Sequence, residues 1–161
     1  MNKKVMVTGA NGLLGQKVIY LLKNRNDIDL IATGKGENRL IEKGGYKYIS
    51  LDITNENLVY NVIEKEAPDA IIHCAAMTNV DACEVDRGNC WLVNVTSVKF
   101  IAQSAEKIGA HLLHISTDFV FDGESGPYSE KDTPNPLHYY AESKLASEEI
   151  VQNICSKWSI A

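Results

Sequence analysis

"VTGANGLLGQKV", residues 7–18, places three glycines at three-residue spacing between an apolar run and a helical pattern. Gly9 lies where the chain turns after the apolar run, and such a turn needs a residue without a Cβ atom. Gly12 and Gly15 open the helix, whose free N–H groups attract a pyrophosphate, and the third glycine lets helix and strand pack closely. A glycine-rich turn without a ligand is the alternative. The stretch predicts the first strand, loop and helix of a dinucleotide-binding domain.

Apolar runs and helical patterns alternate along the rest of the chain. The apolar runs occupy residues 4–9, 29–34, 46–50, 70–75 and 111–116, and the helical patterns occupy about 12–24, 55–66, 89–108 and 137–156. The runs are continuous rather than alternating, as is typical of strands buried on both faces. Repeated strand-helix-strand units predict an α/β fold with a doubly wound parallel sheet of the Rossmann type.

The last residues, "KWSIA", have the pattern of a sixth strand. Either Trp158 to Ala161 form a short edge strand, or the chain is the first part of a longer protein. We favour the second interpretation, because half of the ligand crevice expected at the end of such a sheet is missing. We therefore expect residues 1–161 to be an NAD(P)-binding Rossmann domain, truncated before a substrate-binding lobe. An unpaired sheet edge would also favour a homo-oligomer.

Composition excludes several classes of protein. The 161 residues are 45% hydrophobic and 23% charged, as in an ordinary globular domain. A net charge of −5 without a long basic run argues against nucleic acid or an anionic membrane as a partner. The chain also has no apolar run of bilayer length and no signal-peptide pattern, so we expect a cytoplasmic protein. Its four cysteines lack metal-ligand spacing, and no metal site is predicted.

The end of the second predicted strand, "ATGKGENR" at residues 32–39, bears on the choice of cofactor. An acidic residue there would accept a hydrogen bond from the ribose 2′-hydroxyl of NAD, whereas basic residues accommodate the 2′-phosphate of NADP. Thr33 and Gly34 take the acidic position, and Lys35 and Arg39 follow. This favours NADP(H) over NAD(H), the alternative being a solvated charged loop that also carries Glu37.

Two further positions complete the sequence-based site. Asp52 follows the third strand, where it would either accept from the adenine amino group or cap a helix, as Thr54 or Asn55 would. In "HYYAESK" (138–144), helical spacing brings Tyr140 and Lys144 to one face. A neighbouring ammonium group favours the phenolate and moves the pKa of Tyr140 toward the working range of an acid, the alternative being a chance pair.

Five motifs occur in the order found in the extended short-chain dehydrogenase/reductases. They are the glycine loop at Thr8–Gly15, "HCAA" at 73–76, Asn94, "STDFVFDG" at 116–123, and the pair Tyr140 and Lys144. The chain resembles the cofactor-binding half of this family over its whole length. Within it, "CAAMTNVDACE" (74–84) and "ISTDFVFDG" (115–123) are most similar to the dTDP-4-dehydrorhamnose reductase branch.

The resemblance implies roles for individual residues. Tyr140 would protonate the sugar oxygen, and Tyr139 would be a packing residue on the same helix. Lys144 would lower the pKa of Tyr140 and hold the nicotinamide ribose. Thr117 would orient the carbonyl and the phenol, and Asp118 would touch the sugar. A simple turn after a strand is the alternative for Thr117 and Asp118. The expected cofactor-binding residues are Gly9, Asn11, Gly12, Leu13, Leu14, Gly15, Lys35, Arg39, Asp52, Ile53, Cys74, Ala75, Ala76, Tyr140 and Lys144.

The function that the resemblance implies is NADP(H)-dependent reduction of a 4-keto nucleotide sugar, with dTDP-4-dehydro-L-rhamnose converted to dTDP-L-rhamnose. One alternative is a nucleotide-sugar epimerase or dehydratase of the same superfamily. Another is a non-catalytic NADP-binding subunit, similar to the regulatory subunit of methionine adenosyltransferase. We expect the 161 residues to bind dinucleotide without turning over a sugar unaided, because substrate positioning needs contacts remote from the reacting atoms.

Overall fold

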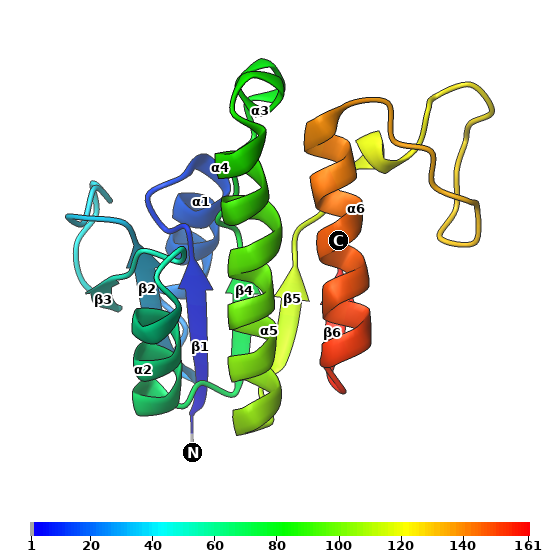
Figure 1. The fold of residues 1–161 in the computed structure, drawn as a ribbon. Helices are drawn as coiled ribbons and strands as arrows, with labels where there is room; N and C mark the ends of the chain where they lie inside the picture. The colour runs from blue at the N-terminus through cyan, green and yellow to red at the C-terminus, as the bar shows by residue number, and fades with distance from the viewer. Residues whose placement is uncertain (1) are drawn as a thin grey trace.

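Six parallel strands form one sheet in the computed structural model, which describes residues 2–161 (Figure 1). The strands lie in the order β3-β2-β1-β4-β5-β6, so the chain winds outward in both directions from β1. Their bounds are β1 Lys3–Thr8, β2 Ile28–Gly34, β3 Lys47–Ser50, β4 Ala70–His73, β5 His111–His114 and β6 Trp158–Ile160. The boundary between β1 and β4 is the topological switch point at which doubly wound sheets bind their ligands.

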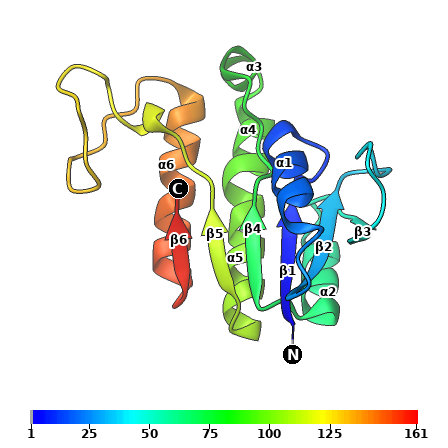
Figure 2. The same cartoon turned by 180° about the vertical axis from the view of Figure 1, so that it is seen from behind.

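Helices connect consecutive strands except β2 and β3, which are joined by a loop, and they cover both faces of the sheet. They are α1 Leu13–Leu22, α2 Glu56–Glu66, α3 Val80–Val85, α4 Arg87–Trp91, α5 Ser97–Ile108 and α6 Tyr139–Ile154. Two short elements complete the set, the π-helix η1 Leu92–Thr96 and the 3₁₀-helix η2 Asp118–Val120. In Figure 1, α2, α5 and α6 lie in front of the sheet; Figure 2 shows α1 on the opposite face.

Apolar residues that alternate along strands β1 to β4 build two cores. Met6 of β1 packs with α2, α5 and α6 in the larger cluster, whereas its neighbour Val7 packs with Ile19 of α1 in the smaller one. All three side chains are fully buried. Burial on both faces explains why the strands read as continuous apolar runs.

Local signals set the helix boundaries. The side chain of Asn55 caps α2 by accepting from the N–H of Leu58, and His138 caps α6 by accepting from Ala141. Gly109 ends α5 with a φ of 71°, a left-handed conformation that glycine adopts at low cost.

The five predicted strands are all present, and a sixth strand at Trp158–Ile160 pairs with β5. The predicted helix at 89–108 is wrong in its detail, because α4 and α5 are joined through the π-helix η1. Helix α3 and the 3₁₀-helix η2 were not predicted, since each is shorter than two helical turns and shows little periodicity. Within residues 2–161, no helix has both the length and the apolar content that a membrane crossing requires.

Candidate active site

The glycine loop brings the start of α1 against the ends of β1 and β4. Gly9 has a φ of 68°, and a Cβ atom there would lie 2.7 Å from the backbone nitrogen of Ala75. A Cβ atom on Gly15 would overlap the carbonyl oxygen of Gly9. Gly12 is the N-cap of α1 and offers no side-chain acceptor, so the first N–H groups of this helix face outward without a side-chain cap.

Two cavities meet at this loop, at the carboxyl ends of the strands. One has a volume of about 380 Å³ and the other about 290 Å³, and they share Gly12 and Cys74 to Ala76 as lining residues. They therefore lie side by side in a cleft across the switch point. The larger cavity is lined by Gly9, Asn11, Gly12, Lys35, Arg39, Asp52, Ile53, Cys74, Ala75 and Ala76 among others, and the smaller by Gly12, Leu13, Leu14, Gly15, Cys74, Ala75, Ala76, Tyr140 and Lys144 among others. The structure thus brings together every residue predicted to bind the cofactor.

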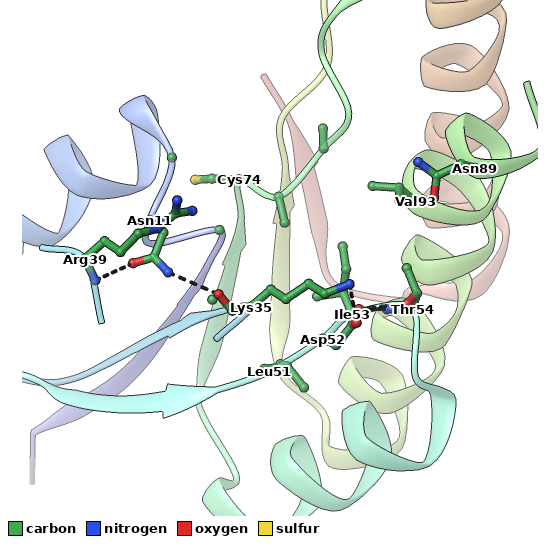
Figure 3. A pocket seen from close by; sticks show the side chains of 15 residues that line it. Asn11, Lys35, Arg39, Leu51, Asp52, Ile53, Thr54, Cys74, Asn89 and Val93 are labelled. Atoms are coloured by element: carbon green, nitrogen blue, oxygen red, sulfur yellow. Dashed lines mark hydrogen bonds and ion pairs between the residues drawn. The ribbon is translucent and has the colours of Figure 1, made fainter. Parts of the chain in front are cut away.

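Asp52 lies on one wall of the larger cavity and pairs with Lys35 (Figure 3). The Lys35 ammonium lies 2.7 Å from Oδ2 of Asp52, and Oδ1 of the same carboxylate accepts from the backbone N–H and the hydroxyl of Thr54. The hydrogen bond from Lys35 lowers the pKa of Asp52. Asp52 is therefore not the helix cap, a role that falls to Asn55, and the cation of Lys35 is already engaged.

Tyr140 lines the smaller cavity and is 8% exposed. Burial raises the pKa of Tyr140, and a hydrogen bond from Thr117 acts in the opposite direction. Lys144 does not contribute to this balance, which differs from the prediction that it lowers the pKa of Tyr140. The phenol therefore holds its proton at neutral pH.

Lys144 lines the same cavity, but its ammonium group contacts a histidine. Its Nζ atom lies 3.2 Å from Nε2 of His114, and only 2% of the residue is exposed. Burial lowers the pKa of Lys144 to about 8, partly offset by the carboxylate of Glu148. Helical spacing predicted that Lys144 lies on the same face of α6 as Tyr140. Its hydrogen-bonding partner, His114, lies on β5.

Thr117 and Asp118 lie at the mouth of β5, outside the linings of the two cavities. Thr117 caps η2 by accepting from the N–H of Phe119, as the turn interpretation predicted. Both residues also act on Tyr140, because the charge of Asp118 raises its pKa and Thr117 lowers it. The turn holds these two side chains beside the phenol.

Tyr139 packs away from the cleft, as predicted. Its ring lies 6.2 Å from that of Trp91, and the guanidinium of Arg87 lies 4.8 Å from the ring centre. The two adjacent tyrosines therefore differ in environment, although both begin α6.

The sequence did not reveal the role of Asn94 in this site. Its side chain is buried in η1 and makes hydrogen bonds of 2.8 Å and 2.9 Å with the backbone N–H and C=O of Met77. It also donates to the hydroxyl of Ser143 on α6. Asn94 thereby ties the segment after β4 to the helix that carries Tyr140. A π-helical turn at this position is consistent with a functional site.

Other lining residues were missed as well. Asn89 and Val93 line the larger cavity four residues apart, so helical spacing within the predicted helix could have identified them. Thr78, Ile115 and Ser116 line the smaller cavity, and no signal in the sequence marks Thr78. Among residues 2–161, no cluster of histidine, cysteine or acidic side chains is arranged to hold a metal ion.

A doubly wound sheet whose glycine loop faces a tyrosine and a lysine across one cleft defines the class of the extended short-chain dehydrogenase/reductases. The chain belongs to the family described as the RmlD substrate binding domain, whose model matches residues 3–161.

Individual relatives agree with this assignment. The dTDP-4-dehydrorhamnose reductase of Aggregatibacter actinomycetemcomitans is 34% identical over 155 residues, covering 96% of this chain and 48% of that protein. The methionine adenosyltransferase 2 subunit beta of Danio rerio is 37% identical over 153 residues, covering 95% and 45%. The crystal structure of dTDP-4-dehydrorhamnose reductase from Bacillus anthracis in complex with NADP superposes with a TM-score of 0.86 at 34% identity, covering 99% of this chain and 52% of that one. The chain spans about half the length of the curated relatives it matches.

Proposed function

We propose that these residues form the cofactor-binding part of an NADP(H)-dependent reductase of a 4-keto nucleotide sugar, with dTDP-4-dehydro-L-rhamnose as substrate and dTDP-L-rhamnose as product. The observation that carries the proposal is the smaller cavity, which has Gly12 to Gly15 on one side and Tyr140 with Lys144 on the other. A phosphate-binding loop and a proton donor thus share one space. The reductase relatives and the NADP complex from Bacillus anthracis support it.

The cleft fits a dinucleotide on three counts. Gly9 and Gly15 allow the backbone of the loop, α1 and the segment after β4 to approach closely, the start of α1 lacks a side-chain cap, and the two cavities share lining residues. Leu13 to Gly15 would offer N–H groups to the pyrophosphate. Asp52 and Ile53 would contact the adenine and Arg39 the 2′-phosphate, while Tyr140 and Lys144 would hold the nicotinamide ribose. The bound cofactor would supply the hydride that reduces the sugar ketone.

The chain itself supplies the proton for the ketone oxygen. An acid must keep its proton until the transition state, and the raised pKa of Tyr140 satisfies this requirement. The Thr117 hydroxyl stabilises the phenolate once the proton has left, since hydrogen bonds to a charged form favour it. Lys144 lies one helical turn away, with its ammonium group 3.2 Å from Nε2 of His114. Asp118 lies where it would contact the sugar.

We further propose that most contacts with the nucleotide and sugar come from a substrate-binding lobe outside residues 1–161. The reductase relatives are about twice as long as this chain, which supports the idea. Residues 1–161 alone should then bind dinucleotide and show little turnover, because correct pKa values supply only part of a rate enhancement.

The adjacent tyrosines provide a matched test. Tyr140→Phe in the complete enzyme should reduce NADPH oxidation with dTDP-4-dehydro-L-rhamnose by a factor on the order of 100 to 10,000, the range for loss of a general acid, while NADPH still binds. Tyr139→Phe removes the same hydroxyl one residue away and should leave the rate nearly unchanged. Equal rates for the two variants would refute the role of Tyr140.

Two other functions remain alternatives. A non-catalytic regulatory subunit is favoured by the methionine adenosyltransferase relatives, which match as closely as the reductase does. NADPH binding without oxidation in the presence of any keto sugar, in the complete protein, would support that alternative. A nucleotide-sugar epimerase or dehydratase would oxidise and reduce its cofactor in one cycle, so it would show no net consumption of NADPH.

A further inference from the structure

We propose that Asn11 and Tyr48 are positioning residues for cofactor selectivity, because together they fill the place of an acidic side chain at position 34 and hold the backbone of residues 34–39. The inference rests on the proposed preference for NADP(H). It concerns how that preference is built, which the basic residues alone do not explain.

The first observation is the space above Gly34, the last residue of β2. A Cβ atom on this residue would lie 3.0 Å from Nδ2 of Asn11 and 3.1 Å from the hydroxyl of Tyr48. Such distances are tighter than ordinary van der Waals contact, and both neighbours are held in place by hydrogen bonds. A carboxylate that reads the 2′-hydroxyl of NAD belongs at this end of β2. Here the amide and the phenol occupy its path.

The second observation is the set of bonds that the pair makes with the loop after β2. Nδ2 of Asn11 donates to the Tyr48 hydroxyl at 3.0 Å and to the carbonyl oxygens of Glu37 at 3.0 Å and Lys35 at 3.4 Å. The Tyr48 hydroxyl lies 3.1 Å, 3.1 Å and 3.2 Å from the carbonyl oxygens of Gly34, Gly36 and Glu37. It has one proton and donates to one of them at a time. Every carbonyl from Gly34 to Glu37 therefore faces one of these two side chains.

The third observation links the pair to Arg39. Oδ1 of Asn11 accepts from the backbone N–H of Arg39 at 2.9 Å, as Figure 3 shows, and the Arg39 side chain lines the larger cavity. Within residues 2–161 no carboxylate lies at ion-pair distance from the Arg39 guanidinium, whereas Lys35 is paired with Asp52. Arg39 is thus the cation available for a phosphate, and Asn11 sets where its side chain begins.

Asn11 is itself fixed from α1. Its carbonyl oxygen accepts from Nε2 of Gln16 at 3.0 Å, one turn further along the chain. The pair therefore couples the glycine loop, the end of β2 and β3 through a small set of polar contacts. A hydrogen-bonded pair of this kind excludes the NAD-reading carboxylate and orients the NADP-reading arginine at once.

Tyr48→Phe tests the inference, because it removes only the hydroxyl and keeps the ring. Titration of the protein with NADPH and NADH should show NADPH affinity reduced by about tenfold, the effect of losing a hydrogen bond that holds the loop, with NADH affinity changed by less than twofold. Tyr20→Phe is the control, since the Tyr20 hydroxyl accepts from Ile41 beyond the loop and should not alter the ratio. If the ratio of NADPH to NADH affinity is unchanged in Tyr48→Phe, the inference is wrong while the proposed cofactor preference stands. Equal affinities in the unmodified protein overturn both it and the proposed cofactor preference.

A second comparison tests the exclusion of an acid. Gly34→Asp alone should gain little NADH affinity, while Gly34→Asp combined with Asn11→Gly should gain about tenfold, as expected when a hydrogen bond to the ribose becomes possible. Thermal unfolding of each variant shows whether it is folded. A tenfold gain in the folded single variant would refute the steric part of the inference, and a variant that fails to fold leaves Tyr48→Phe as the deciding measurement.

Discussion

The ammonium group of Lys144 lies 3.2 Å from Nε2 of His114, and both side chains are buried. The hydroxyl oxygen of Ser147 lies 2.9 Å from the same imidazole nitrogen, so Nε2 faces both an ammonium group and a hydroxyl group. Burial lowers the pKa of Lys144 to about 8 and that of His114 to about 2. A proposed catalytic lysine is thus held against a neutral histidine, in a place where charge is costly. That cost predicts how stability varies with pH.

Lys144→Met should remove one part of the pH dependence of stability. The unfolded state binds the lysine proton up to a pKa of 10.5, whereas the folded state releases it near 8, so this group makes the protein more stable as pH rises between these values. The full effect is about 3 kcal/mol. Urea unfolding from pH 7 to pH 10.5 should show this contribution in the unmodified protein and not in the variant.

Buried thiols act in the opposite direction over the same range. Burial raises the pKa values of Cys74 and Cys155 to about 11, so their contribution to stability falls as pH rises above 9. The quantity to compare is therefore the difference between the stability–pH curves of the unmodified protein and of Lys144→Met, rather than the slope of either curve. Lys99→Met changes an exposed lysine and serves as the control. If Lys144→Met and Lys99→Met gave the same curve, the Lys144 ammonium would not be buried as described.

His73 and His114 should make the protein sensitive to mild acid. Their rings stack 5.6 Å apart, and burial lowers the pKa of His73 to about 3. Unfolded histidines take up protons near pH 6.5, so stability should fall as pH drops from 6.5 towards 4.5, by about 1.4 kcal/mol per pH unit for each histidine once protonation is complete. His73→Asn should roughly halve this slope in urea unfolding. The exposed His111→Asn should not, and a full slope in His73→Asn would contradict the assignment.

Gly15→Ala should damage both the fold and the cofactor site. Its new methyl group would overlap the Gly9 carbonyl, and overpacking of this kind costs about 1 to 3 kcal/mol or more. Dinucleotide affinity should fall with it, because the loop and the start of α1 must separate. Gly88→Ala is the control, since a Cβ atom there meets only a side-chain oxygen of Asp86 at 3.9 Å and alanine stabilises a helix by up to about 1 kcal/mol. Chemical denaturation and dinucleotide titration of both variants would decide; equal stabilities would refute the predicted overlap.

Arg39→Ala should weaken NADPH binding more than Lys35→Ala does. A phosphate must compete with Asp52 for Lys35, whereas the Arg39 guanidinium faces the cavity without an ion-pair partner within residues 2–161. Loss of a charge-assisted hydrogen bond costs about 1.5 to 3 kcal/mol, so we expect a loss of about tenfold to a hundredfold for Arg39→Ala. Titration with NADPH measures it, with Lys17→Ala on the exposed side of α1 as control. A larger loss of NADPH affinity in Lys35→Ala than in Arg39→Ala would contradict this prediction.

The sequence by itself determined the elements that depend on local pattern. Continuous apolar runs identified five strands, because strands buried on both faces have no polar side. The glycine loop and the pair Tyr140 and Lys144 followed from fixed spacing, since a turn needs residues without a Cβ atom and a helix brings residues four apart to one face. Helix α3 and the π-helix η1 were missed because each is too short for a period to show.

Only the tertiary structure decided which side chains meet. His114 lies 30 residues from Lys144 in the chain, and Tyr48 lies 37 from Asn11, yet each pair is in hydrogen-bonding contact. Such contacts follow from the order of strands in the sheet, which places β3 beside β2 and β2 beside β1. The pKa of Tyr140 and the engagement of Lys35 by Asp52 likewise depend on burial and on distant neighbours. Spacing along the chain fixes which face a residue occupies, but the partner on that face is set by how the elements pack.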